Sequence, residues 1–205
     1  MRRGVFFVLA AISLASAFAV ARGDAAVSQG VRTAVHAKVL DSKRAARPAT
    51  ARSQRRRTVR SAMAALESSV VARMNAVRRS RGLRPLRLNP RLRSAALFHS
   101  RDMGRRGYFE HDSLSGTPFW RRIERFYPSR GFDAWTVGEN LLWGSDTYSA
   151  SFAVREWMNS PPHRQNLLSR SWREVGIGAA YFAHAPGEYD GRPVTIVTAD
   201  FGSRR

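Results

Sequence analysis

The apolar residues that precede Gly82 recur at the interval of one face of a helix. Leu66, Val70, Met74 and Val77 follow one another at spacings of four, four and three residues, which is the repeat of an α-helix with a buried stripe. Gly82 comes next, and glycine commonly ends a helix. The pattern predicts a first helix from about residue 64 to residue 81.

Helix signals continue through the middle of the chain. Asn89 is a favourable N-cap and Pro90 suits the first helical position, so a second helix is expected from Pro90 to the Gly104–Gly107 region. Its inner stripe includes His99. Three shorter helical segments are expected after it, opening at Thr117-Pro118, spanning residues 147–159 and starting at Ser160-Pro161.

The C-terminal part of the chain changes to the pattern of β-strands. Residues 175–182 are apolar with small side chains, residues 193–201 are rich in Val, Thr and Ile, and both are typical of strands. Residues 185–191, with one proline and two glycines, suit the hairpin loop between them, and a third strand is expected around residues 139–143. The order of the segments predicts an α+β fold in which helices pack on a small, mostly antiparallel sheet.

The N-terminus resembles an export signal. Arg2 and Arg3 precede an apolar run from Val5 to Val20, and Ala19-Val20-Ala21 fits a signal-peptidase site. The alternative is an uncut membrane anchor, but the run is shorter than the ~20 residues that a bilayer span needs. We therefore expect a cleaved signal peptide over residues 1–21, no transmembrane segment after cleavage, and a secreted or envelope-associated protein.

Charge separates a second segment from the rest. The net charge is +20, and residues 61–205, with 22 basic and 13 acidic side chains, hold only +9 of it. Residues 22–62 are rich in Ala, Arg, Ser and Thr, lack aromatic residues and carry an arginine cluster. Such a segment buries too little apolar surface to offset its chain entropy, so we expect a disordered Arg-rich linker that acts as a spacer or a tether to polyanions.

Three loop motifs could carry chemistry. They are Tyr108-Phe109-Glu110-His111-Asp112, Gly138-Glu139-Asn140, and the stretch from Trp157 to Leu168 that contains Ser160-Pro161-Pro162-His163. In this order and spacing, the chain from about Leu66 to Gly202 resembles the CAP superfamily (cysteine-rich secretory proteins, antigen 5 and pathogenesis-related proteins), in its bacterial, disulfide-free branch. The resemblance implies a CAP domain over residues 63–205, folded as a three-layer α-β-α sandwich.

The resemblance also implies a cleft with two histidines and two acidic residues. By motif, His111, Glu139 and His163 match three of the four. The second acid normally stands three residues after the helix tryptophan, and that position here is Ser160. Glu156 points about 100° away from Trp157 on a helix and is not expected to replace it.

Two imidazoles and one carboxylate are ordinary ligands of Zn²⁺ or another divalent cation, and three ligands would leave a position for a polarised water. His111, Glu139 and His163 are therefore candidate metal ligands and candidate catalytic residues. The resemblance implies metal binding in some family members without a settled reaction. The same trio could instead be a hydrogen-bond network that ties loops to the sheet.

Three functions remain open at this point. The first and favoured one is a monomeric binding module for a lipid, an anionic envelope polymer or a protein partner, with no nucleic acid expected because the chain is exported. The second is a metal-dependent, peptidase-like hydrolase that uses the trio. The third is a structural interaction protein of the envelope. The chain contains no cysteine, which excludes disulfides, thiol redox chemistry and cysteine-ligated zinc.

Other polar residues receive structural interpretations. His99 is expected to be a satisfied core histidine, and His36 and His184 to be solvated. Asn140 is expected to hold its loop through bonds to the backbone, and Arg164 either to pair with an acid near the site or to be solvated. Trp157 is expected in the core, whereas the other tryptophans could line the core or the cleft.

Overall fold

Five α-helices and four strands make up the part of the chain that the structure describes. The structure is a computed structural model, and it describes residues 47–144 and 148–205. The helices are α1 (Arg47–Arg79), α2 (Pro90–Arg106), α3 (Phe119–Phe126), α4 (Ala150–Asn159) and α5 (Pro161–Leu168). The strands are β1 (Arg87–Leu88), β2 (Trp135–Gly144), β3 (Glu174–Phe182) and β4 (Val194–Arg204), and a 3₁₀ turn spans Gly187–Tyr189.

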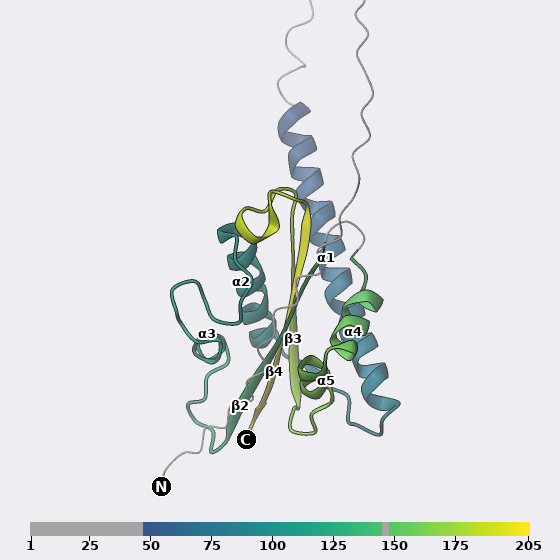
Figure 1. The fold of residues 1–205 in the computed structure, drawn as a ribbon, viewed down its shortest axis with the longest axis vertical. Coiled ribbons are helices and arrows are strands. Elements are labelled where there is room, and N and C mark those ends of the chain that lie inside the picture. Colours follow the sequence, from purple (N-terminus) through teal and green to yellow (C-terminus); the bar gives the residue numbers. More distant parts are fainter. Residues whose placement is uncertain (1–46, 145–147) are drawn as a thin grey trace, which may run out of the picture. The chain divides into compact units, whose positions relative to one another are not determined.

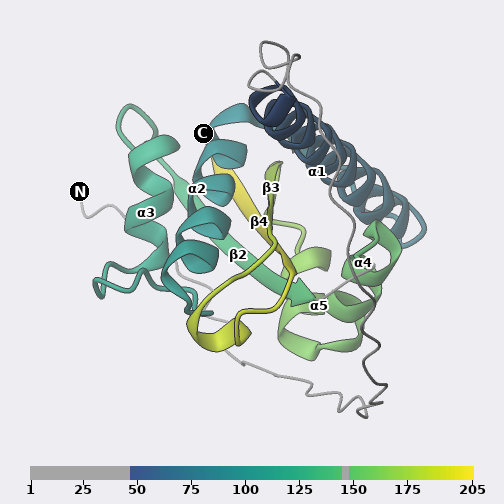
Figure 2. The same ribbon diagram turned by 90° about the horizontal axis from the view of Figure 1, so that it is seen from above.

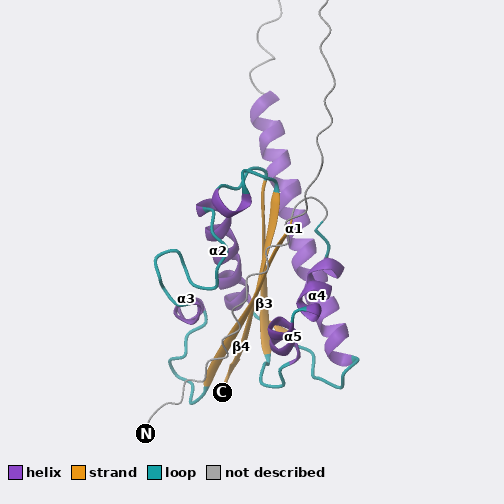
Figure 3. Ribbon diagram, in the orientation of Figure 1, coloured by secondary structure: helices purple, strands orange, loops and turns teal. Residues whose placement is uncertain are grey.

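The strands form one sheet in the order β1-β3-β4-β2. Figures 1 and 3 label its three long strands, β2, β3 and β4. β4 pairs antiparallel with both β3 and β2, and only the two-residue β1 runs parallel to its neighbour β3. Helices α2 and α3 cover one face of the sheet, while α4, α5 and the second half of α1 cover the other (Figure 2). The predicted α+β, three-layer α-β-α architecture with a mostly antiparallel sheet is thus confirmed.

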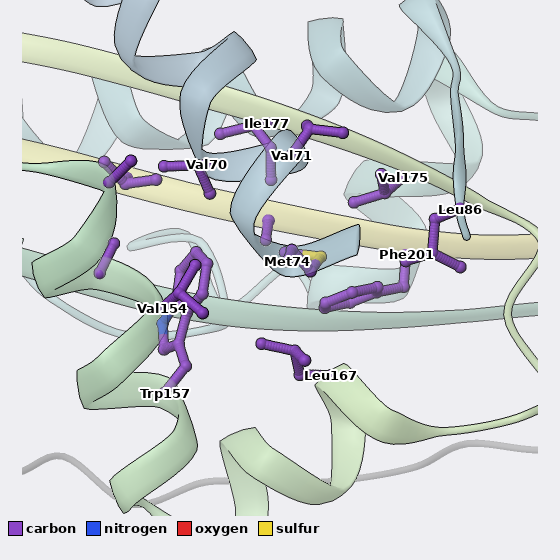
Figure 4. Packing of buried hydrophobic residues seen from close by; sticks show 14 of the residues in the cluster. Val70, Val71, Met74, Leu86, Val154, Trp157, Leu167, Val175, Ile177 and Phe201 are labelled. Atoms are coloured by element: carbon purple, nitrogen blue, oxygen red, sulfur yellow. The ribbon is translucent and has the colours of Figure 1, made fainter. Parts of the chain in front are cut away.

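The larger core lies on the α1/α4/α5 face. In this core, α1 contributes Val70 and Met74 and α4 contributes Trp157. These side chains pack against residues of the central strands β3 and β4, as Figure 4 shows. Alternate residues of β4, including Val197, Ala199 and Phe201, point to this core and are completely buried. The residues between them point to the opposite face of the sheet, so they are the residues of β4 that lie beneath α2.

Helix α2 lies directly on β3 because two glycines leave room for it. A Cβ atom at Gly176 would lie 1.9 Å from the backbone nitrogen of Arg93, and one at Gly178 would lie 2.1 Å from that of Leu97. Asn89 caps the helix as expected, accepting hydrogen bonds from the backbone nitrogens of Arg91 and Leu92 at 2.9 and 3.2 Å. This close contact fixes the distance between α2 and the sheet.

The first helix starts earlier than the sequence predicts. Residues 47–62 were expected to be part of a disordered linker, yet they form the first half of α1. Alanine, arginine and glutamine favour helix, and the segment runs without a breaker into the amphipathic stretch. The chain divides near residue 58 into two units, of which residues 59–205 belong to the one described above.

The expected signal peptide (residues 1–21) and the rest of the linker (residues 22–46) lie outside the described residues. Among the residues that are described, no helix combines the length and the apolar character needed to cross a membrane.

Candidate functional site

Glu139 lies at the centre of the site, on the edge strand β2. It faces α2 and α3, and its carboxylate is completely shielded from solvent. His111, in the loop after α2, bonds Glu139 Oε1 through Nδ1 at 2.8 Å. The loop is held in turn by Asp112, whose Oδ1 accepts a hydrogen bond from the backbone nitrogen of Phe119 at 2.9 Å. The sequence prediction that His111 and Glu139 meet is therefore correct.

The second oxygen of Glu139 is occupied by an arginine. Arg122, on α3, is 1% exposed and donates a hydrogen bond from Nη2 to Glu139 Oε2. Burial alone would raise the pKa of Glu139, but Arg122, His99 and His111 together lower this pKa to about 2. The carboxylate is therefore ionised at neutral pH and makes a buried, charge-assisted pair with the guanidinium.

His99 approaches the same carboxylate from α2. Its Nε2 lies 2.9 Å from the backbone oxygen of Glu110 and 4.0 Å from Glu139 Oε1. Burial lowers the pKa of His99 to about 4, although Glu139 opposes this effect. The neutral ring can donate from Nε2 to Glu110, so that Nδ1 is left without a partner in the described part of the chain. His99 is buried in the core as expected, but only one of its two ring nitrogens has a hydrogen-bond partner.

His163 lies near this cluster without joining it. It sits in the first turn of α5, where its Nδ1 is 2.9 Å from Ser160 Oγ. Its backbone oxygen accepts a hydrogen bond from Asn140 Nδ2 at 3.0 Å, which confirms the loop-holding role expected of Asn140. Burial, followed by the charge of His111, lowers the pKa of His163 to about 4. Within the described chain, no hydrogen bond or ion pair links His163 to His111 or Glu139.

The two histidines share one feature. Each uses Nδ1 for a neighbour, Glu139 for His111 and Ser160 for His163, and in each the described residues offer no partner to Nε2. The His111 side chain is 21% exposed, and His163 is partly buried. Both Nε2 atoms are thus the ring nitrogens that remain for a bound molecule.

These residues do not fit a divalent metal held by all three members of the trio. Nowhere in the described ranges do three His, Cys, Asp or Glu side chains lie where they could hold a metal ion. Both oxygens of Glu139 are already bonded, one of them to the positively charged Arg122, which would repel a cation. Glu156 does not supply the missing acid, since it pairs with Arg155 at the surface.

Two members of the cluster were missed by the sequence analysis. Arg122 follows Phe119 at the i+3 position on the inner side of α3, and Asp200 is the one acid of the buried strand β4. Asp200 lies opposite Glu139 in the pairing of β2 with β4. Each is a charged residue at a position that the periodicity marks as internal, and this signal could have identified both.

The remaining predictions concern residues outside the cluster. Trp157 is completely buried, as expected, and its Nε1 donates a hydrogen bond to the Leu141 oxygen at 3.0 Å. His184 is exposed, and exposed Arg164 bonds the Met158 oxygen and no acid of the site. His36 lies outside the described residues.

Comparisons with known proteins agree with this architecture. The model of the cysteine-rich secretory protein family (CAP) matches residues 71–201, nearly two thirds of the chain. The protein therefore belongs to the CAP family, and the absence of cysteine places it among the members without disulfides.

Named relatives come from several bacteria. The chain is 36% identical over 119 residues to the uncharacterized protein YkwD of Bacillus subtilis, covering 58% of this chain and 44% of that protein. An extracellular SCP-domain protein of Bacillus anthracis matches with 25% identity and a TM-score of 0.54, over 70% of this chain and 42% of that one. An outer surface protein of Borrelia burgdorferi has the same fold, with 23% identity and a TM-score of 0.50, over 66% of this chain and 90% of its own. The chain thus spans less than half the length of the two Bacillus proteins.

Proposed function

We propose that the protein is an exported CAP-domain binding module, in which His111 and His163 contact a ligand of the cell envelope through their Nε2 atoms. The observation that carries the proposal is the shared arrangement of the two rings, with Nδ1 bonded inside the protein and Nε2 left over. Export is supported by the signal-like N-terminus and by the extracellular and surface relatives.

The His111 ring is oriented by its carboxylate. Because ionised Glu139 accepts the Nδ1 proton, a neutral His111 ring carries its lone pair on Nε2 and accepts a hydrogen bond there. His163 is neutral above its lowered pKa of about 4. A ring nitrogen that accepts hydrogen bonds suits the hydroxyl and amide donors that are common in envelope polymers and lipid headgroups.

The rest of the cluster supports binding more than catalysis. The acid that the family places at position 160 is absent, and Glu139 is committed to His111 and Arg122. The charged groups behind His111 are buried and mutually bonded, so they hold the ring in place instead of contacting a ligand. We take this rigid backing as the function of Glu139 and Arg122.

Retention of the purified chain on isolated cell-wall material and on phospholipid vesicles tests the proposal. The vesicles contain phosphatidylcholine alone or mixed with phosphatidylglycerol. His111→Ala and His163→Ala should each reduce retention on one of these probes at least several-fold, whereas His184→Ala, at an exposed hairpin position, should not. Equal retention of all three variants would overturn the assignment, provided that circular dichroism shows them folded.

A further inference from the structure

The N-terminal half of α1 carries a concentration of positive charge that the site does not use. Residues 50–62, here called the basic segment, contain five arginines within nine positions: Arg52, Arg55, Arg56, Arg57 and Arg60. The five side chains are all exposed, and the first acidic residue of the helix is Glu67. The segment is therefore purely cationic over several helical turns.

Helix geometry gathers four of these five charges on one side. With about 100° per residue, Arg52, Arg56 and Arg60 lie on successive turns and Arg55 lies beside them, whereas Arg57 is turned about 140° away from Arg52. No ion pair connects the five arginines to an acidic side chain in the part of the chain that the structure describes. Like charges four residues apart destabilise a helix, so an external anion would stabilise the segment.

The opposite side of the basic segment identifies the kind of anion. It presents Gln54, Thr58 and Ser61, all polar, with no large apolar side chain among them. A helix that lies in a bilayer surface needs an apolar face to bury among the lipids. Within the basic segment the only apolar side chain larger than alanine is Val59, on the arginine side, and α1 packs into the core from Met63 onward. The segment therefore suits a polyanion in water better than a lipid surface.

Arginine is suited to one class of polyanion in particular. Its planar guanidinium makes paired hydrogen bonds to phosphate oxygens. Residues four apart are separated by ~6 Å along the helix axis, so that neighbouring arginines can bind neighbouring groups of a flexible chain. We infer that the basic segment binds a linear phosphodiester polymer along the Arg52-Arg56-Arg60 side. Because the N-terminus resembles an export signal, the occupant we assign is a phosphate-containing polymer of the cell envelope, and a nucleic acid is the alternative that the test distinguishes.

The test measures binding of the full chain to a poly(glycerol phosphate) probe and to a single-stranded oligonucleotide with the same number of phosphates. The variant Arg52→Gln/Arg56→Gln/Arg60→Gln removes three charges from the basic segment and keeps good helix formers. The matched control, Arg91→Gln/Arg101→Gln/Arg105→Gln, removes three charges from exposed positions of α2. The net charge is therefore the same in both variants.

The segment variant should bind at least ~10-fold more weakly at physiological salt, and the slope of log affinity against log salt should fall by about two, because fewer counterions are released. The control should lose less than about threefold. These results with the poly(glycerol phosphate) probe support the inference, whereas binding to the oligonucleotide alone would overturn it, because the occupant would then be a nucleic acid. Equal losses in the two variants, no binding to either probe, or binding only to vesicles that contain phosphatidylglycerol would overturn the inference.

The basic segment shares no residue with the histidine cluster, so the two proposals fail independently. His111→Ala should leave phosphodiester binding unchanged, and the segment variant should keep whatever retention depends on His111. If both substitutions abolish binding to the same probe, the basic segment is not a site of its own and the inference is wrong.

Discussion

Glu139 and Asp200 lie opposite each other on adjacent strands, with both side chains completely buried on the same face of the sheet. Glu139 has two bonded partners, whereas neither oxygen of Asp200 accepts a hydrogen bond from the described residues. Burial, and then the charge of Glu139, raises the pKa of Asp200 well above its ordinary value. The pair therefore carries one negative charge, which matches the one positive charge of Arg122.

The first prediction follows from the proton on Asp200. A carboxyl group whose pKa is raised in the folded state stabilises the fold below pH ~4, and this contribution is lost as the pH rises towards the folded-state pKa. Asp200→Asn removes the titration, so its stability relative to the wild type should increase with pH above 4, by up to ~1.4 kcal/mol per unit. Urea unfolding at several pH values from 4 to 8 measures the difference.

Asp133→Asn, outside the buried cluster, controls for the general loss of a carboxyl group. A difference between Asp200→Asn and the wild type that stays constant from pH 4 to pH 8 would show that Asp200 is ionised in the fold.

A second prediction concerns the cation that balances this pair. Arg122→Gln leaves the ionised Glu139 buried without its main counter-charge, and breaking such a pair destabilises a fold by about 3–5 kcal/mol. Adding Glu139→Gln to Arg122→Gln should recover part of the loss, because no buried charge then remains. Chemical denaturation of the two single variants and the double variant gives the coupling energy directly.

Arg155→Gln is the matched control. The Arg155–Glu156 pair is 3.2 Å long, but its side chains are 60% and 37% exposed, so its removal should change stability by less than ~1 kcal/mol. If Arg122→Gln is no more damaging than Arg155→Gln, Arg122 does not neutralise Glu139.

The third prediction is that His99 and His163 remain neutral in mildly acidic solution. Burial lowers both pKa values to about 4. The unfolded chain binds these protons near pH ~6.5. The contribution of the two neutral histidines to stability should therefore be complete above that pH and should be lost as the pH falls towards the folded-state pKa. NMR titration of the ring resonances checks the protonation, with His184 as an internal reference. If His99 were charged at about one pH unit below the ordinary histidine pKa, its buried placement would be contradicted.

The sequence predicted the fold well where a local pattern determines it. The stripe from Leu66 to Val77 and the Asn89 cap each depend on neighbours within a few residues, and both are present as expected. The basic segment was misjudged because its composition lacks apolar residues, although its helix propensity is high. Propensity and burial point in opposite directions there, and the chain follows its helix propensity.

The site was predicted only as far as its motifs reach. His111 and Glu139 were paired correctly, since the loop motifs of the family contain both. Arg122 and Asp200 meet Glu139 only through the packing of α3 and the register of β2 with β4, and a single sequence gives no measure of either. Those two residues decide the charge of the cluster, and Arg122 opposes a metal at Glu139.

The last prediction concerns the close contact between α2 and β3, which holds His99 near Glu139. Gly178→Ala would put a Cβ atom 2.1 Å from the backbone nitrogen of Leu97 and 2.4 Å from the carbonyl carbon of Ala96, and neither backbone atom can move without the helix. We expect a loss of more than ~3 kcal/mol in stability, since overpacking a rigid contact costs about 1–3 kcal/mol and here the whole helix must shift.

Gly116→Ala is the control, because its φ of +76° is strained for alanine but no atom lies within 4 Å of the added methyl group, which limits the loss to about 1–2 kcal/mol. Thermal and urea unfolding would rank the two, and the NMR signal of His99 should move in Gly178→Ala alone. A similar loss in both variants would mean that α2 can adjust its height, so that the contact between helix and strand does not set the geometry of the site.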